Sequence, residues 1–292
     1  MILADRAYPF VRRAATDRRA RWTRYDEAMQ QPDSARPLQP GRQARRGASR
    51  AAFFGGSFDP PHLGHLAVAH AAQAAFRLDT VLFAPVGVQP LKPEGSGASF
   101  DERLAMTRLA IAGEPGFEIS LADAPRPSGE HPFTPNYPPN YTIDTLENLR
   151  AGLTAECALF CLMGADAFFG LRRWHRAAEI PFVAPLIVVS RPGQPLAGLK
   201  AALPPGLTME PAADGDKTES GVEVRAFVLV NQTGDRAPFY LLPGLDVEIS
   251  ASEIREGIRA QIQAAQGSAV TGADLVPAAV RVYIAEHNLY RS

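Results

Sequence analysis

The sequence predicts an α/β fold, a Rossmann-like parallel sheet with helices on both faces. Two observations favour this class. From residue 51 onward, short apolar runs alternate with helical segments, as in successive βαβ units. A loop rich in glycine and proline follows the first apolar run, and in such sheets ligands bind beyond the carboxyl ends of the strands. We therefore expect a ligand site at this loop.

The elements follow one another along the chain. The run AAFF at 51–54 predicts a strand, and the Ala-rich segment 63–76 predicts a helix because alanine has the highest helix propensity. The segment 100–111 predicts a helix with apolar residues at Leu104, Leu109 and Ile111. Further strands are expected at 80–85, 117–120, 158–164 and 182–191, and further helices at 141–153 and 250–262.

The chain divides into an extension and a domain. Residues 1–50 hold 12 arginines and 5 acidic residues, and we expect a basic, disordered or partly helical extension there. Residues 51–292 form the expected folded domain, with 18 basic and 26 acidic residues. Within it, 192–221 predicts a flexible insertion, and 124–140, with six prolines, predicts an irregular loop.

Composition limits the class of protein. The chain has 46% hydrophobic and 21% charged residues and no run of 18 apolar residues, so we expect no membrane partner. Cys157 and Cys161 are expected to be buried thiols of a reducing, cytoplasmic compartment. The basic extension lacks interleaved aromatic residues, so no nucleic-acid partner is expected. An RNA- or membrane-docking role for this arm remains an alternative, and so does an over-extended translation start.

The loop GGSFDPPHLGHL, residues 55–66, does not match three common motifs of catalytic or nucleotide-binding loops. A nucleophile elbow requires Gly-x-Ser-x-Gly, whereas this loop has Asp59 in the final position. The chain holds no Gly-Lys-Ser/Thr triplet of a Walker A loop. The only similar glycine pair, Gly95 and Gly97, does not lie between a strand and a helix, as a dinucleotide fingerprint would.

The residues that remain indicate an anion site. Gly55 and Gly56 let a ligand approach exposed backbone N–H groups. His62 and His65, three residues apart at the start of a predicted helix, project from one face beside the helix N–H groups and the positive end of its dipole. Gly64 leaves room for a flat base. A surface histidine pair is the plainer alternative.

This loop resembles the signature of nucleotidyltransferases with a His-x-Gly-His motif. Related loops occur in class I aminoacyl-tRNA synthetases, so the loop alone indicates a superfamily. Further motifs follow in order: YTIDTL at 141–146, LMGADAFFGLRRWH at 162–175, VVSRPG at 188–193, ISASEIR at 249–255 and LVPAAVRVYIAEHNLY at 275–290. Together they resemble the bacterial nicotinate-nucleotide adenylyltransferases, over about residues 51–290. The resemblance implies a nucleotidyltransferase fold.

The resemblance also implies the site residues. The catalytic positions are His62, His65, Lys92 and Arg255. The ATP-binding positions are Gly55, Gly56, Ser57, Phe58, Gly64, Asp166, Ser250 and Ser252. The substrate-binding positions are Tyr141, Thr142, Trp174 and His175. No residue is assigned to a metal.

Several of these positions also have a physical interpretation. Ser250 as an N-cap, with Arg255 one turn later, builds a second anion site, although an ordinary capped surface helix has the same pattern. Asp166 at a strand end suits ribose hydroxyls. Trp174 offers a flat face to a ring, unless it is a core residue. The helix start at Thr142 prefers a carboxylate to a neutral amide, which favours nicotinate over nicotinamide.

The chain departs from the family pattern at two segments. In QPLK, Gln89 and Leu91 replace expected residues, so Lys92 is the one recognisable phosphate contact there. In ISASEIR, Ala251 stands where serine is common. Neither change removes a charge from the predicted phosphate sites.

The resemblance implies adenylyl transfer from ATP to nicotinate mononucleotide, with Mg²⁺ entering with ATP. The mononucleotide phosphate is ionised at pH 7, so in-line attack requires no general base. The alternatives are another small-molecule nucleotidyltransferase, such as one that adenylylates phosphopantetheine, and an inactive nucleotide-binding sensor. A homo-oligomer is compatible with the sequence.

Overall fold

The computed structural model describes residues 49–91, 95–126, 137–190, 196–213, 215, 217–219, 222–243, 250–263 and 275–291. Contacts place Gly47–Ser292 in one compact unit. The expected basic extension therefore lies outside the described residues, except for Ser49 and Arg50, the second of which begins the first strand. Among the described helices, none is long and apolar enough to cross a bilayer.

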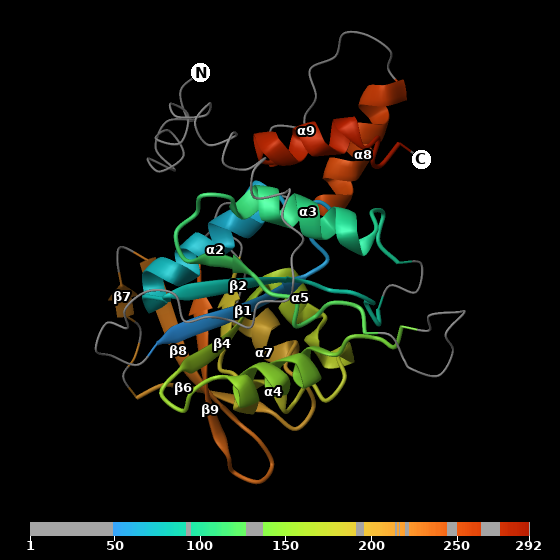
Figure 1. Ribbon diagram of the computed structural model, residues 1–292. Coiled ribbons are helices and arrows are strands. Elements are labelled where there is room, and N and C mark those ends of the chain that lie inside the picture. The colour runs from blue at the N-terminus through green and yellow to red at the C-terminus, as the bar shows by residue number, and fades with distance from the viewer. Residues whose placement is uncertain are drawn as a thin grey trace. The chain divides into compact units, whose positions relative to one another are not determined.

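The described elements alternate between strand and helix over most of the chain (Figure 1). The strands are β1 (Arg50–Gly56), β2 (Thr80–Pro85), β3 (Phe117–Ile119), β4 (Ala158–Gly164), β5 (Leu186–Val189), β6 (Thr208–Pro211), β7 (Lys217–Glu219), β8 (Val222–Val230) and β9 (Arg236–Leu242). The helices are α2 (Leu63–Phe76), α3 (Phe100–Ile111), α4 (Thr142–Gly152), α5 (Ala165–Phe169), the 3-10 turn η2 (Leu171–Arg173), α6 (Ile180–Val183), α7 (Leu196–Ala201), α8 (Ala251–Gln263) and α9 (Ala278–Glu286).

The strands form one sheet in the order β3-β2-β1-β4-β5-β9-β8-β6, and β7 pairs with β8. All pairs from β3 to β9 are parallel, whereas β8 pairs antiparallel with β9, β6 and β7. After β1 the chain continues to β2 on one side, and it returns to place β4 on the other side of β1. The carboxyl ends of β1 and β4 thus form a topological switch point, where parallel sheets bind their ligands.

Helices cover both faces of the sheet, as predicted. Along β4, Leu159, Cys161 and Met163 belong to one buried cluster, while Phe160 and Leu162 belong to another. Successive strand residues point to opposite faces, so both faces are buried, and this explains the continuous apolar run of β4. Residues of α4 to α7 pack in the first cluster and residues of α2 in the second; Figure 1 shows α4 and α2 on opposite sides of the sheet.

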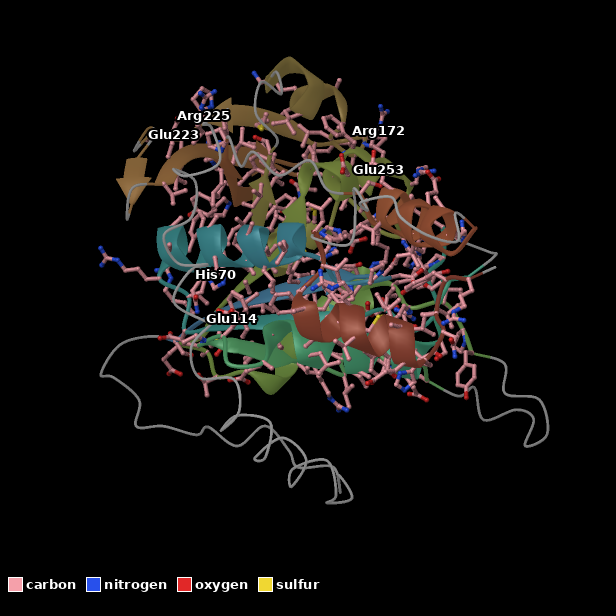
Figure 2. All side chains as sticks on the ribbon, turned by 90° about the horizontal axis from the view of Figure 1, so that it is seen from above. His70, Glu114, Arg172, Glu223, Arg225 and Glu253 are labelled. Carbon is pink, nitrogen blue, oxygen red and sulfur yellow. The ribbon has the colours of Figure 1, made fainter. Side chains whose placement is uncertain are left out.

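Polar contacts at the periphery fix α2 against the turn between α3 and β3. Figure 2 labels His70 on α2 and Glu114 in that turn, and His70 Nε2 lies 3.2 Å from Glu114 Oε2. Gln73, one turn further along α2, donates a hydrogen bond to the carbonyl of Pro115.

The prediction of one strand over 182–191 is wrong. Helix α6 ends at Val183, and the strand β5 spans only Leu186–Val189. Pro181 lies in the first turn of α6, where proline is favoured. Ala184 precedes Pro185 and is extended, with φ −145° and ψ 115°, because a following proline disfavours helical backbone.

Regular structure also occupies part of the range 192–221, for which the sequence indicates a flexible insertion. Helix α7 and strands β6 and β7 lie within it. β6 extends the main sheet through its antiparallel pairing with β8. The proline-rich loop at 124–140 is described only at its two ends, where it contains no helix or strand.

Candidate active site

Two adjoining cavities lie at the carboxyl ends of β1 and β4. One, which we call the first cavity, has a volume of about 500 Å³, and the second cavity about 420 Å³. Five residues line both: Gly55, Gly56, Ser57, Met163 and Ala167. Two ligands seated in the two cavities would therefore meet at the glycine loop after β1.

The histidine pair lines the second cavity. His62 is the N-cap residue of α2 and His65 lies in its first turn, and their ring centroids are 3.7 Å apart. This confirms that the spacing of three places both imidazoles on one face. Within the described part of the chain, His62 Nδ1 is buried without a hydrogen-bond partner.

Burial decides the charge of this pair. It lowers the pKa of His62 from 6.5 to about 4. It also lowers the pKa of His65 well below 6.5, with a smaller effect from neighbouring His62. Both imidazoles are therefore neutral at pH 7, and a neutral imidazole carries one N–H donor and one acceptor nitrogen.

The tautomer of His65 follows from its backbone neighbour. The N–H of His62 donates to His65 Nδ1 at 3.1 Å. Nδ1 is consequently an acceptor, and the proton of the neutral ring is on Nε2. His65 thus carries an N–H donor on the nitrogen that its own helix does not use.

The two glycines at the end of β1 are required by close packing. A Cβ on Gly55 would lie 2.8 Å from the ring of Phe53, and one on Gly56 would lie 3.3 Å from the ring of Phe58. Phe58 is buried, with φ +47°, a strained conformation for a residue with a side chain. Its ring packs 4.9 Å from that of His65, so Phe58 supports the loop as well as lining the second cavity.

The start of α8 faces the histidine pair across the second cavity. Ser250, Ala251 and Arg255 line it. The carbonyl of Ser250 accepts the first helical hydrogen bond, from Ile254, which agrees with the predicted N-cap position. Ser252 does not line this cavity: its exposed hydroxyl accepts a hydrogen bond from Arg255 Nη2 at 3.1 Å, so it orients Arg255.

The end of β4 supplies the other wall of the second cavity. Gly164 and Asp166 both line it, as does Gly64 from α2. No heavy atom lies within 4 Å of a Cβ built on Gly164, so this position borders open space. Asp166 is exposed in the first turn of α5, where its carboxylate is accessible to a ligand hydroxyl.

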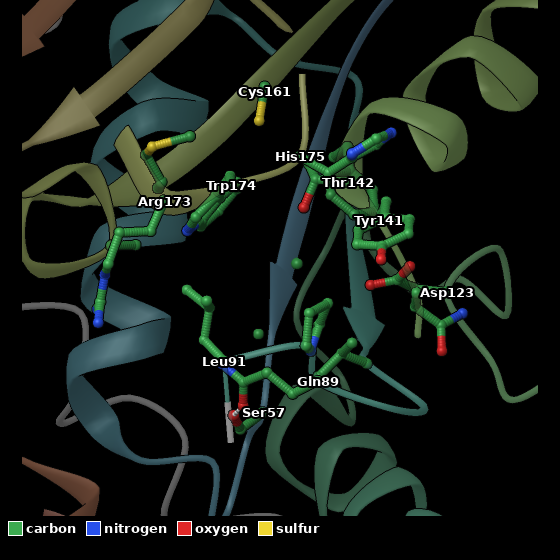
Figure 3. A pocket seen from close by; sticks show the side chains of 18 of the residues that line it. Ser57, Gln89, Leu91, Asp123, Tyr141, Thr142, Cys161, Arg173, Trp174 and His175 are labelled. Carbon is green, nitrogen blue, oxygen red and sulfur yellow. Dashed lines mark hydrogen bonds between the residues drawn. The ribbon is translucent and has the colours of Figure 1, made fainter. Parts of the chain in front are cut away.

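The first cavity is lined by all four predicted substrate-binding residues, Tyr141, Thr142, Trp174 and His175. Figure 3 shows Trp174 on one side of the cavity and Thr142 and Tyr141 on the other. Trp174 also packs, partly buried, against the main buried cluster, so it contributes to the core as well as to the cavity wall. Tyr141 is the N-cap residue of α4, and its ring centroid lies 4.4 Å from that of His175.

Sequence reasoning missed several residues that build the first cavity. Asp123 is buried and accepts a hydrogen bond from the Thr145 hydroxyl at 2.7 Å; burial raises its pKa, which that hydrogen bond opposes. Asn140 accepts from the Val88 N–H and donates to the Ala124 carbonyl. Asp123 and Asn140 flank the part of the proline-rich loop that lies outside the described residues, and the sequence offers no periodic signal there.

Two exposed or partly exposed polar side chains also line the first cavity. The Ser57 hydroxyl donates to Gln89 Oε1 at 2.7 Å, which joins the glycine loop to the segment after β2. Arg173 lies on the wall beside Trp174 and is exposed (Figure 3). Lys92, the predicted phosphate contact of that segment, lies outside the described residues.

The described side chains contain no group of three or more His, Cys, Asp or Glu residues arranged to hold a metal ion. Cys157 and Cys161 are free and buried, as expected, and burial raises the pKa of the Cys161 thiol to about 12.

Comparisons with known proteins show the family of the chain. The cytidylyltransferase-like family model matches residues 53–257. A probable nicotinate-nucleotide adenylyltransferase of Pelobacter propionicus is 34% identical over 242 residues, covering 82% of this chain and 96% of that protein. A protein of the same description from Gloeobacter violaceus is 38% identical over 200 residues, covering 66% and 89%. A third, from Thermus thermophilus, is 33% identical over 244 residues, covering 83% and 100%.

Among solved structures, a Plasmodium falciparum nicotinic acid mononucleotide adenylyltransferase complexed with NaAD matches with a TM-score of 0.55 and 15% identity. The match covers 83% of this chain and 97% of that one, and it shows the shared fold. The chain belongs to the cytidylyltransferase-like family, among the nicotinate-nucleotide adenylyltransferases.

Proposed function

We propose that the protein transfers the adenylyl group of ATP to nicotinate mononucleotide, which yields deamido-NAD and pyrophosphate. The junction of the two cavities at Gly55, Gly56 and Ser57 carries this proposal. ATP occupies the second cavity, beside the histidine pair and the start of α8. The mononucleotide occupies the first cavity, with its phosphate directed toward the junction.

The reaction is a single displacement at phosphorus. An oxygen of the mononucleotide 5′-phosphate forms a bond to the α-phosphorus of ATP. The bond from that phosphorus to the oxygen bridging toward the β-phosphorus breaks, and pyrophosphate leaves with the electron pair. The attacking phosphate is already ionised at pH 7, so the site has to position two anions rather than remove a proton.

Named groups supply that positioning. The Nε2–H of His65 and the imidazole of His62 donate hydrogen bonds to phosphate oxygens, and each ring gains a favourable charge interaction if the anion raises its pKa. Arg255, with the N–H groups at the start of α8, holds the leaving phosphates. Asp166 accepts hydrogen bonds from the adenosine ribose.

The start of α4 selects the pyridine substituent. Thr142 is its first residue, and its side chain and the helix N–H groups border the first cavity beside His175. A carboxylate gains from this positive helix end, whereas a neutral carboxamide does not. Nicotinate mononucleotide is therefore the preferred acceptor, and the face of Trp174 holds its ring by stacking.

Magnesium enters as part of the ATP substrate. The described side chains include no cluster that would hold a metal ion, and the ATP phosphates with water would hold Mg²⁺, as is usual in nucleotide sites. Its charge offsets the repulsion between the two polyanions.

A pyrophosphate-release assay with three acceptors tests the proposal. ATP and Mg²⁺ are supplied with nicotinate mononucleotide, nicotinamide mononucleotide or phosphopantetheine, and a reaction without acceptor is the blank. We expect the highest kcat/KM with nicotinate mononucleotide. Preference for phosphopantetheine would replace the proposal by the other adenylyltransferase, and silence with all three despite ATP binding would favour a nucleotide sensor.

A further inference from the structure

Helix α8, which carries Arg255, rests on a small buried cluster separate from the two clusters on the sheet. We call it the C-terminal core. It combines residues of the segment before α3, of α3 itself, of α8, and of α9 with the segments on either side of it. Its buried members are Ala98, Met106, Ala110, Ile254, Val276, Val280, Ile284, Leu289 and Tyr290. The position of Arg255 therefore depends on how this core is fixed to the glycine loop.

A hydrogen bond between two buried side chains joins the C-terminal core to the loop. The Tyr290 hydroxyl donates to Asp59 Oδ1 at 2.8 Å, across 231 positions of sequence. Both side chains are buried, with exposed fractions of 5% and 4%. Burial, and then the Asp59 carboxylate, raise the pKa of Tyr290 above its ordinary value, so the phenol stays protonated as a donor.

Asp59 is the acceptor for several groups at once. Its Oδ2 accepts from the Gly97 N–H at 2.7 Å and its Oδ1 from the Ala98 N–H at 3.1 Å. Arg255 Nη1 lies 3.8 Å from Oδ2 and donates to the Asp59 carbonyl at 2.7 Å. A buried carboxylate requires such donors, and the loss of any one is costly. The backbone carbonyl of Asp59 thus holds Arg255, and the side-chain carboxylate of Asp59 is held by Tyr290.

Close packing supports the same contact. A Cβ on Gly97 would lie 3.2 Å from the Tyr290 ring and 3.4 Å from Arg255 Cδ. The absence of a side chain at Gly97 leaves room for both Tyr290 and Arg255 to pack against this position. Replacing the tyrosine by phenylalanine keeps this packing and removes only the hydroxyl.

A second buried group fixes the opposite side of the loop. Arg103 of α3, 2% exposed, donates to the Ser57 carbonyl and to the Val86 carbonyl, each at 2.7 Å. It also donates to the Ala98 carbonyl at 3.3 Å. The loop is therefore held by Arg103 of α3 as well as by Tyr290, and Arg255 contacts the same loop at Asp59.

We propose that Tyr290 is a positioning residue for adenylyl transfer, which acts through Asp59 to place Arg255 at the ATP phosphates. The inference rests on the proposed function for its reaction and adds a residue that lies in neither cavity wall. It implies that Tyr290 affects ATP binding and leaves mononucleotide binding unchanged, because Tyr141, Thr142 and Trp174 belong to other elements.

The test compares Tyr290→Phe with Tyr283→Phe in the full chain. Tyr283 is a matched control in α9: it is only partly buried, and its ring stacks on His287 at 3.8 Å. We measure kcat, the KM of each substrate and the thermal midpoint, and ATP·Mg²⁺ binding by calorimetry. For Tyr290→Phe we expect kcat/KM for ATP to fall about tenfold and ATP affinity to weaken, with the KM for nicotinate mononucleotide unchanged.

Other outcomes overturn the inference. If Tyr290→Phe left kcat/KM for ATP and ATP affinity unchanged, the inference would be wrong. An equal rise in both KM values, or a lower thermal midpoint with both KM values unchanged, would also contradict it. Asp59→Asn, which removes the acceptor charge, should weaken ATP binding in the same direction. Because ATP binding is measured without the mononucleotide, failure of the wild-type protein to form deamido-NAD would reject the proposed function and still leave the role of Tyr290 tested.

Discussion

Arg176 and Glu147 join the turn that carries Trp174 and His175 to helix α4. Arg176 Nη2 donates to Glu147 Oε1 at 2.8 Å and Nη1 donates to Oε2 at 3.2 Å. The same guanidinium donates to both carboxylate oxygens of Glu179, at 2.7 and 3.1 Å. These hydrogen bonds raise the pKa of Arg176 above its ordinary value, and the bonds with Glu179 contribute more than those with Glu147. The two walls of the first cavity are thus linked by one exposed residue.

Replacing Arg176 by alanine should loosen this link. We expect the KM for nicotinate mononucleotide to rise about fivefold, since even networked surface ion pairs contribute modestly. The KM for ATP should stay the same. Steady-state kinetics with each substrate varied in turn measures both. Arg236→Ala is the control, because Arg236 makes an exposed ion pair with Glu210 away from either cavity.

Trp174 should contribute to mononucleotide binding through its ring face. Trp174→Leu keeps an apolar side chain and removes the aromatic surface, so we expect the KM for nicotinate mononucleotide to rise about tenfold. Phe182→Leu removes an aromatic ring that packs on the same buried cluster without lining the cavity. Equal losses of mononucleotide affinity in both variants would assign Trp174 to the core alone.

A substitution at Gly164 tests ATP binding without a loss of thermal stability. Its φ of −75° and ψ of 159° suit alanine, and a Cβ there would touch no heavy atom within 4 Å. Gly164→Ala should keep the thermal midpoint and weaken ATP binding about tenfold, because the methyl group would occupy ligand space. Gly152→Ala, at a second glycine with open space around it, should leave ATP binding unchanged and raise the thermal midpoint slightly, because Gly152 is the last residue of α4 and alanine favours a helix. Unaltered ATP binding in Gly164→Ala would place ATP elsewhere.

The buried His62 predicts a dependence of stability on pH. Its folded pKa is about 4 against 6.5 when exposed, so between these values the unfolded chain binds more protons. Acidification from pH 7 to pH 5 should therefore lower the free energy of unfolding, by about 2 kcal/mol for this group. Urea unfolding of the wild type and His62→Gln at both pH values measures the effect. The variant should lose less stability, and equal losses would show that His62 is not held neutral by burial.

Much of the central fold was predictable because its signals are local. The Ala-rich helix at 63–76 and the apolar strands at 80–85 and 158–164 have the predicted bounds. The strand expected at 182–191 was wrong because Pro185 divides that apolar run between α6 and β5. The β8–β9 hairpin was missed, although a turn with Asn231 and Gly234 separates its alternating strands.

The site was predictable where one short segment holds several of its residues. The loop from Gly55 to His65 and the turn at Trp174 and His175 were identified with their neighbours. Asp123 and Arg103 act only through contacts formed on folding, and the bond between Asp59 and Tyr290 joins opposite ends of the domain. No spacing in the sequence indicates such a pairing.

The most direct measurement follows deamido-NAD and pyrophosphate together, by chromatography with mass spectrometry, during incubation with ATP, Mg²⁺ and nicotinate mononucleotide. We predict equal molar formation of both products, and a turnover about a hundredfold lower in His65→Ala, which lacks the Nε2–H donor. Pyrophosphate without deamido-NAD, or an unchanged turnover in that variant, would contradict adenylyl transfer at the histidine pair.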